Sequence, residues 1–180
     1  GNVLSLLEAC QEHIHTGPSD IWTMFHSFAF DFSVWEIFGA LLHGSKLIII
    51  PELQARDTES FIEILHKGGV TMLSQTPSAF KQFLITYFDN PSPPILRLRH
   101  IFFGGEALDV GSLKPWFDYY GDREPQLTNM YGITETTVHV TYRPIRIKDL
   151  AENYYSPIGI PIPDLSVRLV DECLNDVPRG

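Results

Sequence analysis

Two hydrophobic patterns alternate along most of the chain. Stretches with a helical period and stretches rich in β-branched and aromatic residues follow one another, separated by Gly, Pro and Asn. We expect helices at 4–13, 34–43, 61–67, 77–84 and 110–120, and strands at 21–27, 46–50, 70–74, 99–103, 126–130 and 138–143. This alternation is typical of βαβ units. The sequence therefore predicts an α/β fold with a mostly parallel sheet flanked by helices.

Local signals add detail to this prediction. Ser33 followed by Glu36 fits a capping box at a helix start. The apolar run 46–50 predicts a buried parallel strand. Alternation at 166–170 predicts a strand of a second, smaller sheet. The core is expected to include the aromatic side chains Trp22, Phe25 and Phe28.

Composition and charge narrow the function classes. The chain has 180 residues, 44% of them hydrophobic, which is enough for one domain with a core. Twenty-two acidic residues against 13 basic ones give a net charge of −9, which disfavours a nucleic-acid partner. No apolar run approaches the roughly 20 residues of a membrane span. The two cysteines, Cys10 and Cys173, give no evidence of a disulfide framework, so we expect a cytoplasmic protein. The seven histidines do not have the spacing of metal ligands, so we assign no metal site to them.

Polar or glycine-rich residues follow three of the predicted strands. They are Ser74, the triplet Gly104-Gly105-Glu106, and the stretch 129–132. Ligands of open α/β sheets bind in the crevice beyond the carboxyl ends of the strands. We therefore expect these three segments to meet at one binding site.

Asp31 is the most unusual of the candidate binding residues. It stands in the sequence FAFDF, among aromatic residues and just before a predicted helix. A carboxylate in such surroundings is costly unless a cation meets it. One interpretation is a helix-capping carboxylate bonded to backbone N–H groups. The other is a counter-ion for an ammonium group of a ligand.

The segment 128–137, with the sequence TNMYGITETT, is the densest group of candidate ligand contacts. A glycine turn followed by hydroxyl residues offers backbone N–H and side-chain O–H donors to a phosphate. Glu135 offers an oxygen ligand for Mg²⁺, and Tyr131 a flat surface for a base. The alternative is an ordinary turn and helix cap at 134–137.

These segments together resemble the adenylation domain of nonribosomal peptide synthetases, a branch of the adenylate-forming superfamily that also contains acyl-CoA synthetases. FDFSVWEIFGALLHG is similar to the substrate-aspartate motif, and NMYGITETT is similar to the Asn-x-Tyr-Gly-Pro-Thr-Glu motif, with Ile133 in place of Pro. LSQTPSAF, IFFGGEAL and SPIGIPIPDLSVRLVDECLNDVPRG fit in the same order. The resemblance spans essentially the whole chain, as part of the large N-terminal subdomain.

The resemblance implies a reaction and a set of roles. The amino acid carboxylate attacks the α-phosphorus of ATP, and the aminoacyl group later passes to a phosphopantetheine carrier domain, with a condensation domain in the same parent chain. Asp31 would bind the substrate ammonium, and Thr134 and Glu135 would hold phosphate and Mg²⁺. The nucleotide site would comprise Gly104, Gly105, Glu106, Asn129, Tyr131, Gly132 and Thr134.

The resemblance also implies a pocket for the substrate side chain. Its positions fall on Asp31, Phe32, Trp35, Ser74, Phe102, Gly104, Met130, Val138 and His139. This set is similar to pockets that select threonine. The large side chains leave little space, while Ser74 and His139 offer polar partners for a β-hydroxyl. We therefore expect L-threonine to be preferred over valine.

The family's phosphate-binding loop and its C-terminal lysine subdomain have no counterpart in residues 1–180. We therefore expect this stretch to be the core of a partial adenylation domain that is inactive in isolation.

The sequence also leaves three alternative functions open. An acyl- or aryl-CoA ligase would have no use for Asp31, and a non-catalytic α/β binding module would not need Thr134 together with Glu135. An acidic interaction domain is supported by the charge alone.

Overall fold

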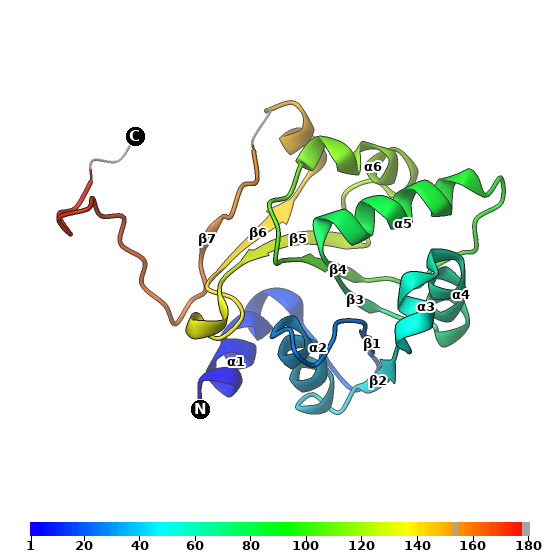
Figure 1. Cartoon of the computed structure of the whole chain (residues 1–180), viewed down its shortest axis with the longest axis horizontal. Helices are drawn as coiled ribbons and strands as arrows, with labels where there is room; N and C mark the ends of the chain where they lie inside the picture. Colours follow the sequence, from blue (N-terminus) through cyan, green and yellow to red (C-terminus); the bar gives the residue numbers. More distant parts are fainter. Residues whose placement is uncertain (153–154, 178–180) are drawn as a thin grey trace.

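A computed structural model describes residues 1–152 and 155–177. It contains one seven-stranded sheet between two layers of helices (Figure 1). The strands are β1 (Ile21–Met24), β2 (Lys46–Ile49), β3 (Met72–Gln75), β4 (His100–Phe103), β5 (Gln126–Tyr131), β6 (Thr141–Ile145) and β7 (Ile160–Pro161). The helices are α1 (Asn2–Ile14), α2 (Phe32–Leu41), α3 (Glu52–Arg56), α4 (Thr58–Gly68), α5 (Pro77–Asp89) and α6 (Lys114–Tyr120). Short 3₁₀ helices are η1 (Val110–Leu113), η2 (Thr134–Thr136) and η3 (Ile147–Leu150).

The strand order is β2-β1-β3-β4-β5-β6-β7. Strands β1 to β5 are parallel, whereas β5 and β6 pair antiparallel, as do β6 and β7. The predicted mostly parallel α/β sheet is therefore confirmed. From β1 the chain goes first to β2 on one side and then to β3 on the other. The order reverses at β1, and such a reversal opens a crevice at the carboxyl ends of the strands.

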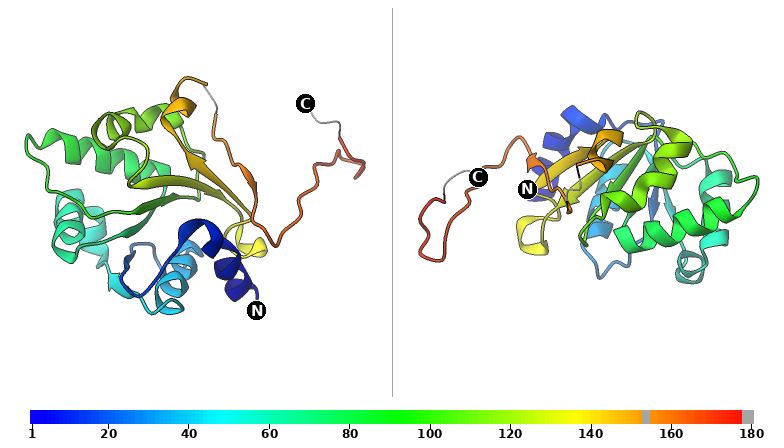
Figure 2. Two further views of the ribbon diagram at one scale, coloured as in Figure 1. Left: turned by 180° about the vertical axis from the view of Figure 1, so that it is seen from behind. Right: turned by 90° about the horizontal axis from the view of Figure 1, so that it is seen from above.

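Side chains alternate along each strand, so the sheet separates two hydrophobic cores. Met72, Phe102 and Met130 pack with α1 and α2, which cover one face. Leu73 and Ile101 pack with α4, α5 and α6 on the other face. The view from behind shows the same two layers, with the segment 163–177 extending away from the sheet (Figure 2).

Helix α2 begins two residues earlier, and with a different cap, than the capping box predicted. The N-cap is Asp31, and Ser33 lies inside the first turn, where its hydroxyl donates to the Phe30 carbonyl at 2.8 Å. Glu36 is completely buried and pairs with His26, so it caps nothing. The Ser33–Glu36 spacing was misleading because the Glu36 carboxylate bonds to His26, ten residues earlier in the chain, and not to the backbone at the helix start.

Three further predictions were wrong. Strand β2 lies at the edge of the sheet, and Ile49 is 68% exposed, so this strand is not buried. In the described part of the chain, 166–170 forms no strand; Val170 makes one isolated bridge to Asp176. Phe28 is 77% exposed. As predicted, Trp22 is in the core under α1 and α2, and Phe25 packs against the core on the other face of the sheet.

The structure also bears on membrane-spanning segments and on the two cysteines. Within the described residues, no helix combines the length and the apolar character needed to cross a membrane. Cys10 is buried, Cys173 is exposed, and both are free thiols. Burial raises the pKa of the Cys10 thiol to about 12, so this thiol is unreactive at neutral pH.

Candidate functional site

A cleft of about 230 Å³ opens beyond the carboxyl ends of the parallel strands. The loop after β1, the glycines after β4 and the connection from β5 to β6 form its walls. It is lined by Phe30, Asp31, Phe32, Gly105, Gly132, Ile133, Thr134, Glu135, Val138 and His139. Residues more than 100 positions apart therefore share one cleft. Two of the three segments expected to meet at one binding site contribute to the cleft, through Gly105 and Gly132, whereas Ser74 is buried and does not line it.

Asp31 lies half-buried at the start of α2 and faces this cleft. It occupies the N-cap position, but its side chain makes no capping hydrogen bond. The helix-capping interpretation of Asp31 therefore lacks its hydrogen bond in this structure. The carboxylate remains available to a group that enters the cleft.

Glu135 faces the same cleft from η2, and its side chain is exposed. No Lys or Arg is present among the described residues that line the cleft. The ion pairs of the described residues involve neither Asp31 nor Glu135. The two carboxylates thus leave the cleft with uncompensated negative charge, which favours a cationic group or a divalent metal ion.

The connection between β5 and β6 is a tight loop. Its ends are joined by the Val140 N–H, which donates to the Tyr131 carbonyl at 2.7 Å. At its tip, the Thr136 hydroxyl donates to the Ile133 carbonyl at 2.9 Å. The turn expected at 134–137 is therefore present, and it directs Thr134 and Glu135 to the cleft. Tyr131 ends β5 with half of its side chain exposed.

Glycines permit the close packing of these loops. A Cβ on Gly132 would lie 2.2 Å from the Val138 carbonyl oxygen, and one on Gly105 would lie 2.9 Å from the Phe30 ring. Gly105 also has a φ of +80°, which strains any other residue. A Cβ on Gly104 would meet the Phe32 and His139 rings at 3.2 and 3.4 Å. At these glycines the backbone itself packs against the neighbouring loop or ring, with little or no space for a side chain.

Of the residues that the resemblance assigns to the side-chain pocket, Asp31, Phe32, Val138 and His139 line the cleft, whereas Trp35, Ser74, Phe102 and Met130 are buried. Ser74 and Phe102 are paired across β3 and β4, on the face that α1 and α2 cover. Met130 joins them on β5, because it stands two residues beyond Thr128, the partner of Phe102. The Trp35 ring from α2 closes this group at 5.3 Å from the Phe102 ring centre. Four of the nine positions implied by the resemblance thus pack together in one buried group.

His139 forms the boundary between this buried group and the cleft. Its ring lies 5.1 Å from the Trp35 ring and 5.2 Å from the Phe32 ring. Burial lowers the pKa of His139 to about 3, so the imidazole is neutral at physiological pH. Among the described residues, no partner meets either His139 ring nitrogen or the Ser74 hydroxyl. Buried polar atoms normally have partners, so these atoms are suited to a polar ligand.

Two residues expected at the nucleotide site use their side chains elsewhere. The Glu106 carboxylate accepts from the Ser78 N–H at 3.0 Å and from the Ser78 hydroxyl at 2.8 Å, which caps the first turn of α5. The Asn129 amide donates to the Pro157 carbonyl at 2.9 Å. Neither residue lines the cleft; of the residues expected at the nucleotide site, Gly105, Gly132 and Thr134 do.

Sequence reasoning missed Phe30 and the His26–Glu36 pair. Phe30 lines the cleft next to Asp31, and its place in the FAFDF run was the available signal. No local signal joined His26 to Glu36, because their contact depends on the packing of the β1–α2 loop. Their hydrogen bond is 3.0 Å long and fully buried.

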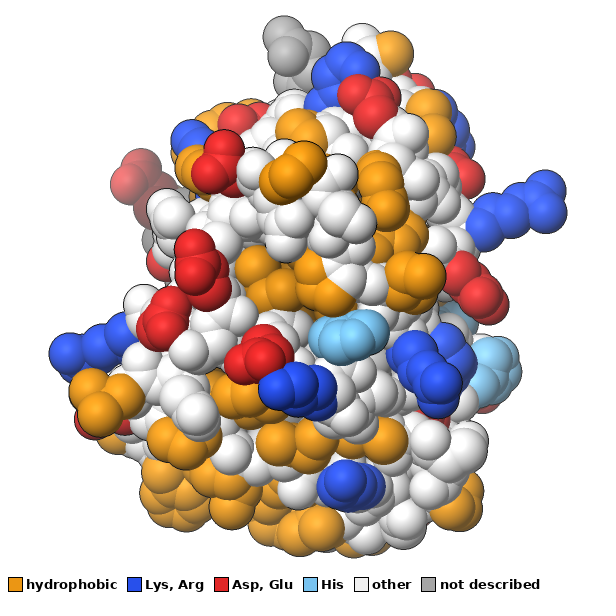
Figure 3. Space-filling model, turned by 90° about the vertical axis from the view of Figure 1, so that its right-hand side faces the viewer, with side chains coloured by type: hydrophobic (Ala, Val, Ile, Leu, Met, Phe, Trp, Pro, Cys, Tyr) orange, Lys and Arg blue, Asp and Glu red, His pale blue; other side chains and the backbone are white. Residues whose placement is uncertain are grey.

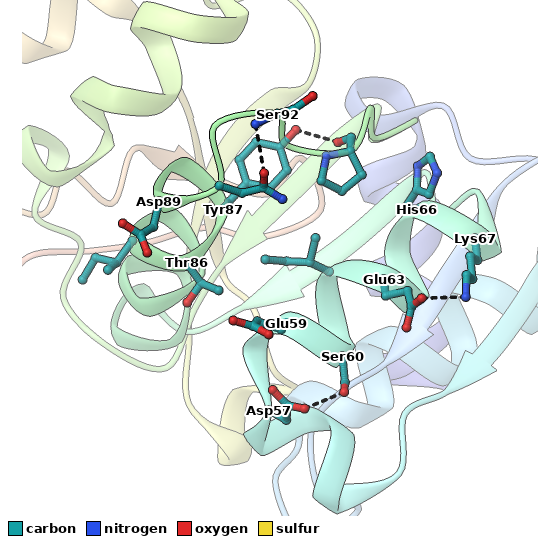
Figure 4. A pocket seen from close by; sticks show the side chains of 14 residues that line it. Asp57, Glu59, Ser60, Glu63, His66, Lys67, Thr86, Tyr87, Asp89 and Ser92 are labelled. Carbon is teal, nitrogen blue, oxygen red and sulfur yellow. Dashed lines mark hydrogen bonds and ion pairs between the residues drawn. The ribbon is translucent and has the colours of Figure 1, made fainter.

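A larger hollow, of about 870 Å³, lies on the other face of the sheet between α4 and α5 (Figure 4). Four of its polar side chains are already paired, Glu63 with Lys67 and Asp57 with Ser60. Charged side chains of both signs are scattered among apolar ones on the face that Figure 3 presents. The α4–α5 hollow contains none of the residues that the sequence singled out, so it is not the candidate site.

Comparisons with known proteins identify the family of this chain. The sequence model of the family described as AMP-binding enzyme matches residues 1–180. A dimodular nonribosomal peptide synthase of Bacillus subtilis (strain 168) is 49% identical over 180 residues, covering 99% of this chain and 8% of that protein. The chain therefore spans a small part of this relative.

Two solved structures show the same fold. The Vibrio cholerae adenylation domain AlmE, crystallised with glycyl-adenosine-5′-phosphate, has a TM-score of 0.80 at 24% identity, over 99% of this chain and 33% of that one. Holo-PA1221, a nonribosomal peptide synthetase protein with adenylation and PCP domains, has a TM-score of 0.78 at 25% identity, over 91% and 27%. Because the family model matches residues 1–180, this chain belongs to the AMP-binding enzymes, a family of adenylate-forming ligases.

Proposed function

We propose that this chain forms the core of an amino-acid-activating adenylation domain in a nonribosomal peptide synthetase. The observation that carries the proposal is the pair of carboxylates, Asp31 and Glu135, that face one cleft without a cation. An acid substrate that lacks an amino group would leave Asp31 unpaired. The placement of Asp31 therefore favours an amino acid over the carboxylic acids of acyl- or aryl-CoA ligases.

In the proposed reaction, an oxygen of the amino acid carboxylate attacks the α-phosphorus of ATP. The new O–P bond forms as the bond to the β-phosphate breaks, and pyrophosphate leaves. Asp31 holds the substrate ammonium, which fixes the carboxylate relative to the phosphate. The Tyr131 ring provides a surface for adenine, and the backbone at Gly105 and Gly132 allows the nucleotide to approach closely.

The residues at η2 fit a magnesium–phosphate complex. Mg²⁺ in nucleotide sites commonly uses one or two carboxylates besides the phosphates, and Glu135 is an exposed carboxylate next to the Thr134 hydroxyl. When bound, Mg²⁺ neutralises charge on the phosphates. Glu135 would hold the ion, and Thr134 would donate a hydrogen bond to a phosphate oxygen.

The test of this assignment is the Glu135→Gln variant of the full protein. The amide keeps the size of the side chain but removes the charge that attracts Mg²⁺. We expect ATP–pyrophosphate exchange to fall at least about 100-fold, the order of effect seen when one electrostatic group is removed. Amino acid binding, followed by calorimetry without ATP, should change less than about twofold. Exchange that remains near the wild-type rate would contradict the role of Glu135.

The pocket composition supports L-threonine as the substrate. Trp35, Phe102 and Met130 restrict its size, while Ser74 and His139 supply unpaired polar atoms. A neutral imidazole has one donor and one acceptor, so His139 can bond a hydroxyl in either sense. A site that hydrogen-bonds a hydroxyl rejects an analogue without it far better than one that senses only size.

Substrate preference is measured by pyrophosphate exchange with single amino acids. We expect kcat/KM for L-threonine to exceed that for L-valine about 100-fold or more, because valine would leave the polar atoms unpaired. Replacing His139 by Phe should reduce this ratio, mainly by lowering kcat/KM for L-threonine. A preference for valine or for a large aromatic amino acid would refute the threonine assignment.

The proposed function also implies partners. We propose that the thiol of a phosphopantetheinylated carrier domain accepts the acyl group of the aminoacyl-adenylate, forming a thioester as AMP leaves, and that a condensation domain is the next consumer. Holo-PA1221, which combines adenylation and PCP domains, supports the first of these.

A further inference from the structure

We propose that His26 and Glu36 position the loop that carries Asp31, so that the pair sets the affinity for the amino acid. The inference rests on the proposed function, because it assumes that Asp31 binds the substrate ammonium. Neither residue lines the cleft. Both are therefore positioning residues that act through their neighbours.

Two hydrogen bonds join the residues. The His26 Nδ1 atom lies 3.0 Å from the Glu36 Oε1 atom, and the His26 backbone N–H donates to Glu36 Oε2 at 3.2 Å. His26 follows β1, whereas Glu36 lies in the second turn of α2. Both ends of the loop with Asp31 are thus fixed to each other by one carboxylate.

The His26 ring also touches the two residues that flank Asp31. It stacks on the Phe32 ring at 4.6 Å between centres and meets the Phe30 ring edge-on at 5.4 Å. Phe30 and Phe32 both line the cleft. The direction of the Asp31 carboxylate is therefore set by side chains that rest on His26.

Burying His26 and Glu36 has a desolvation cost, which supports a role for the pair in positioning the Asp31 loop. Glu36 has no exposed surface and His26 is 9% exposed. Burial raises the pKa of the Glu36 carboxyl above its usual range. Among the described residues, His26 Nε2 has no hydrogen-bond partner. An apolar pair of similar volume would fill this space without these desolvation costs.

Three variants of the full protein separate positioning from general stability. His26→Phe keeps a ring against Phe32 but removes the side-chain bond to Glu36. Glu36→Gln is the matched control, because its amide can preserve both bonds with the other histidine tautomer. A double variant, H26F with E36M, leaves no unpaired buried acid and serves if the single variant does not fold.

The measurement is ATP–pyrophosphate exchange with the amino acid and ATP varied in turn, alongside the melting temperature. We expect H26F, and the double variant, to raise KM for the amino acid about tenfold. KM for ATP and kcat should stay within about twofold, and E36Q should behave as the wild type.

An unchanged amino acid KM in folded H26F or in the double variant would overturn the inference. The inference would also be overturned if the variants lost activity only in proportion to a lower melting temperature, with the KM values for the amino acid and for ATP unaltered. If the wild-type protein shows no amino-acid-dependent exchange, the proposed function itself fails, and this inference fails with it. Wild-type exchange with an unaltered KM in the variants would overturn the positioning role alone.

Discussion

Burial decides what individual histidines in this chain can do. His100 is 4% exposed, and its Nε2 lies 2.8 Å from the Thr128 hydroxyl. Burial lowers the pKa of His100 to about 3, and the same cause lowers the pKa of His139 to about 3. Both rings are neutral at physiological pH. They can exchange hydrogen bonds with neutral groups, but they offer no positive charge to the two carboxylates of the cleft.

The buried histidines predict an acid-sensitive fold. Between pH 6.5 and pH 3 the unfolded chain binds a proton at His100 that the folded chain does not, so stability is lost as the pH falls through this range. We expect this histidine to contribute a loss of about 1.4 kcal/mol at pH 5.5 compared with pH 7.5. His100→Gln removes that contribution while keeping a polar side chain near Thr128.

The measurement is urea unfolding of wild type and His100→Gln, followed by tryptophan fluorescence at both pH values. The difference in unfolding free energy between the two proteins should shift by about 1.4 kcal/mol in favour of the variant at pH 5.5. Between pH 7.5 and pH 8.5 it should stay constant. A difference that does not vary with pH would show that His100 titrates normally in the folded protein.

At the scale of elements, the loop between β5 and β6 depends on backbone packing. Thr137 and Val138 have φ values of 68° and 66°, which β-branched residues rarely adopt. Gly132 lies against the Val138 carbonyl, with no space for a Cβ. The loop is therefore held in a strained form by its own close contacts.

Replacing Gly132 by Ala tests this packing. The new Cβ would meet backbone atoms that cannot rotate away, so the loop must move. We expect a loss of about 2 kcal/mol or more in unfolding free energy and weaker ATP binding. Gly17→Ala is the control, because a Cβ there meets nothing within 4 Å. That variant should change stability by less than about 0.5 kcal/mol. Equal effects of the two substitutions would exclude the packing argument.

The element predictions succeeded where the signal was local. Helix α5 begins after Thr76, whose hydroxyl accepts from the Ala79 N–H, with Pro77 in its first turn, as the sequence indicated. The prediction of a capping box at Ser33 was wrong because Glu36 is buried in a pair with His26. Strand β2 was misread as buried because an apolar run does not reveal whether the strand lies at an edge.

At the scale of the whole molecule, the fold brings distant segments to one edge of the sheet. Asp31, Gly105 and Glu135 come from three different connections, yet they line one cleft. The sequence indicated this convergence from the polar and glycine residues that follow the predicted strands and from the resemblance to family motifs. It did not predict that the Glu106 side chain caps α5 or that His26 supports Phe32, because both facts depend on side-chain packing across elements.

The most direct test of the account is the kinetics of Asp31→Asn in the full protein. Asp31 makes no capping bond, so the variant should fold normally. In amino-acid-dependent ATP–pyrophosphate exchange we expect KM for the amino acid to rise about 100-fold, the loss of one buried charge pair. KM for ATP should stay within about threefold. An unchanged amino acid KM, or wild-type exchange driven equally well by an acid without an amino group, would contradict the account.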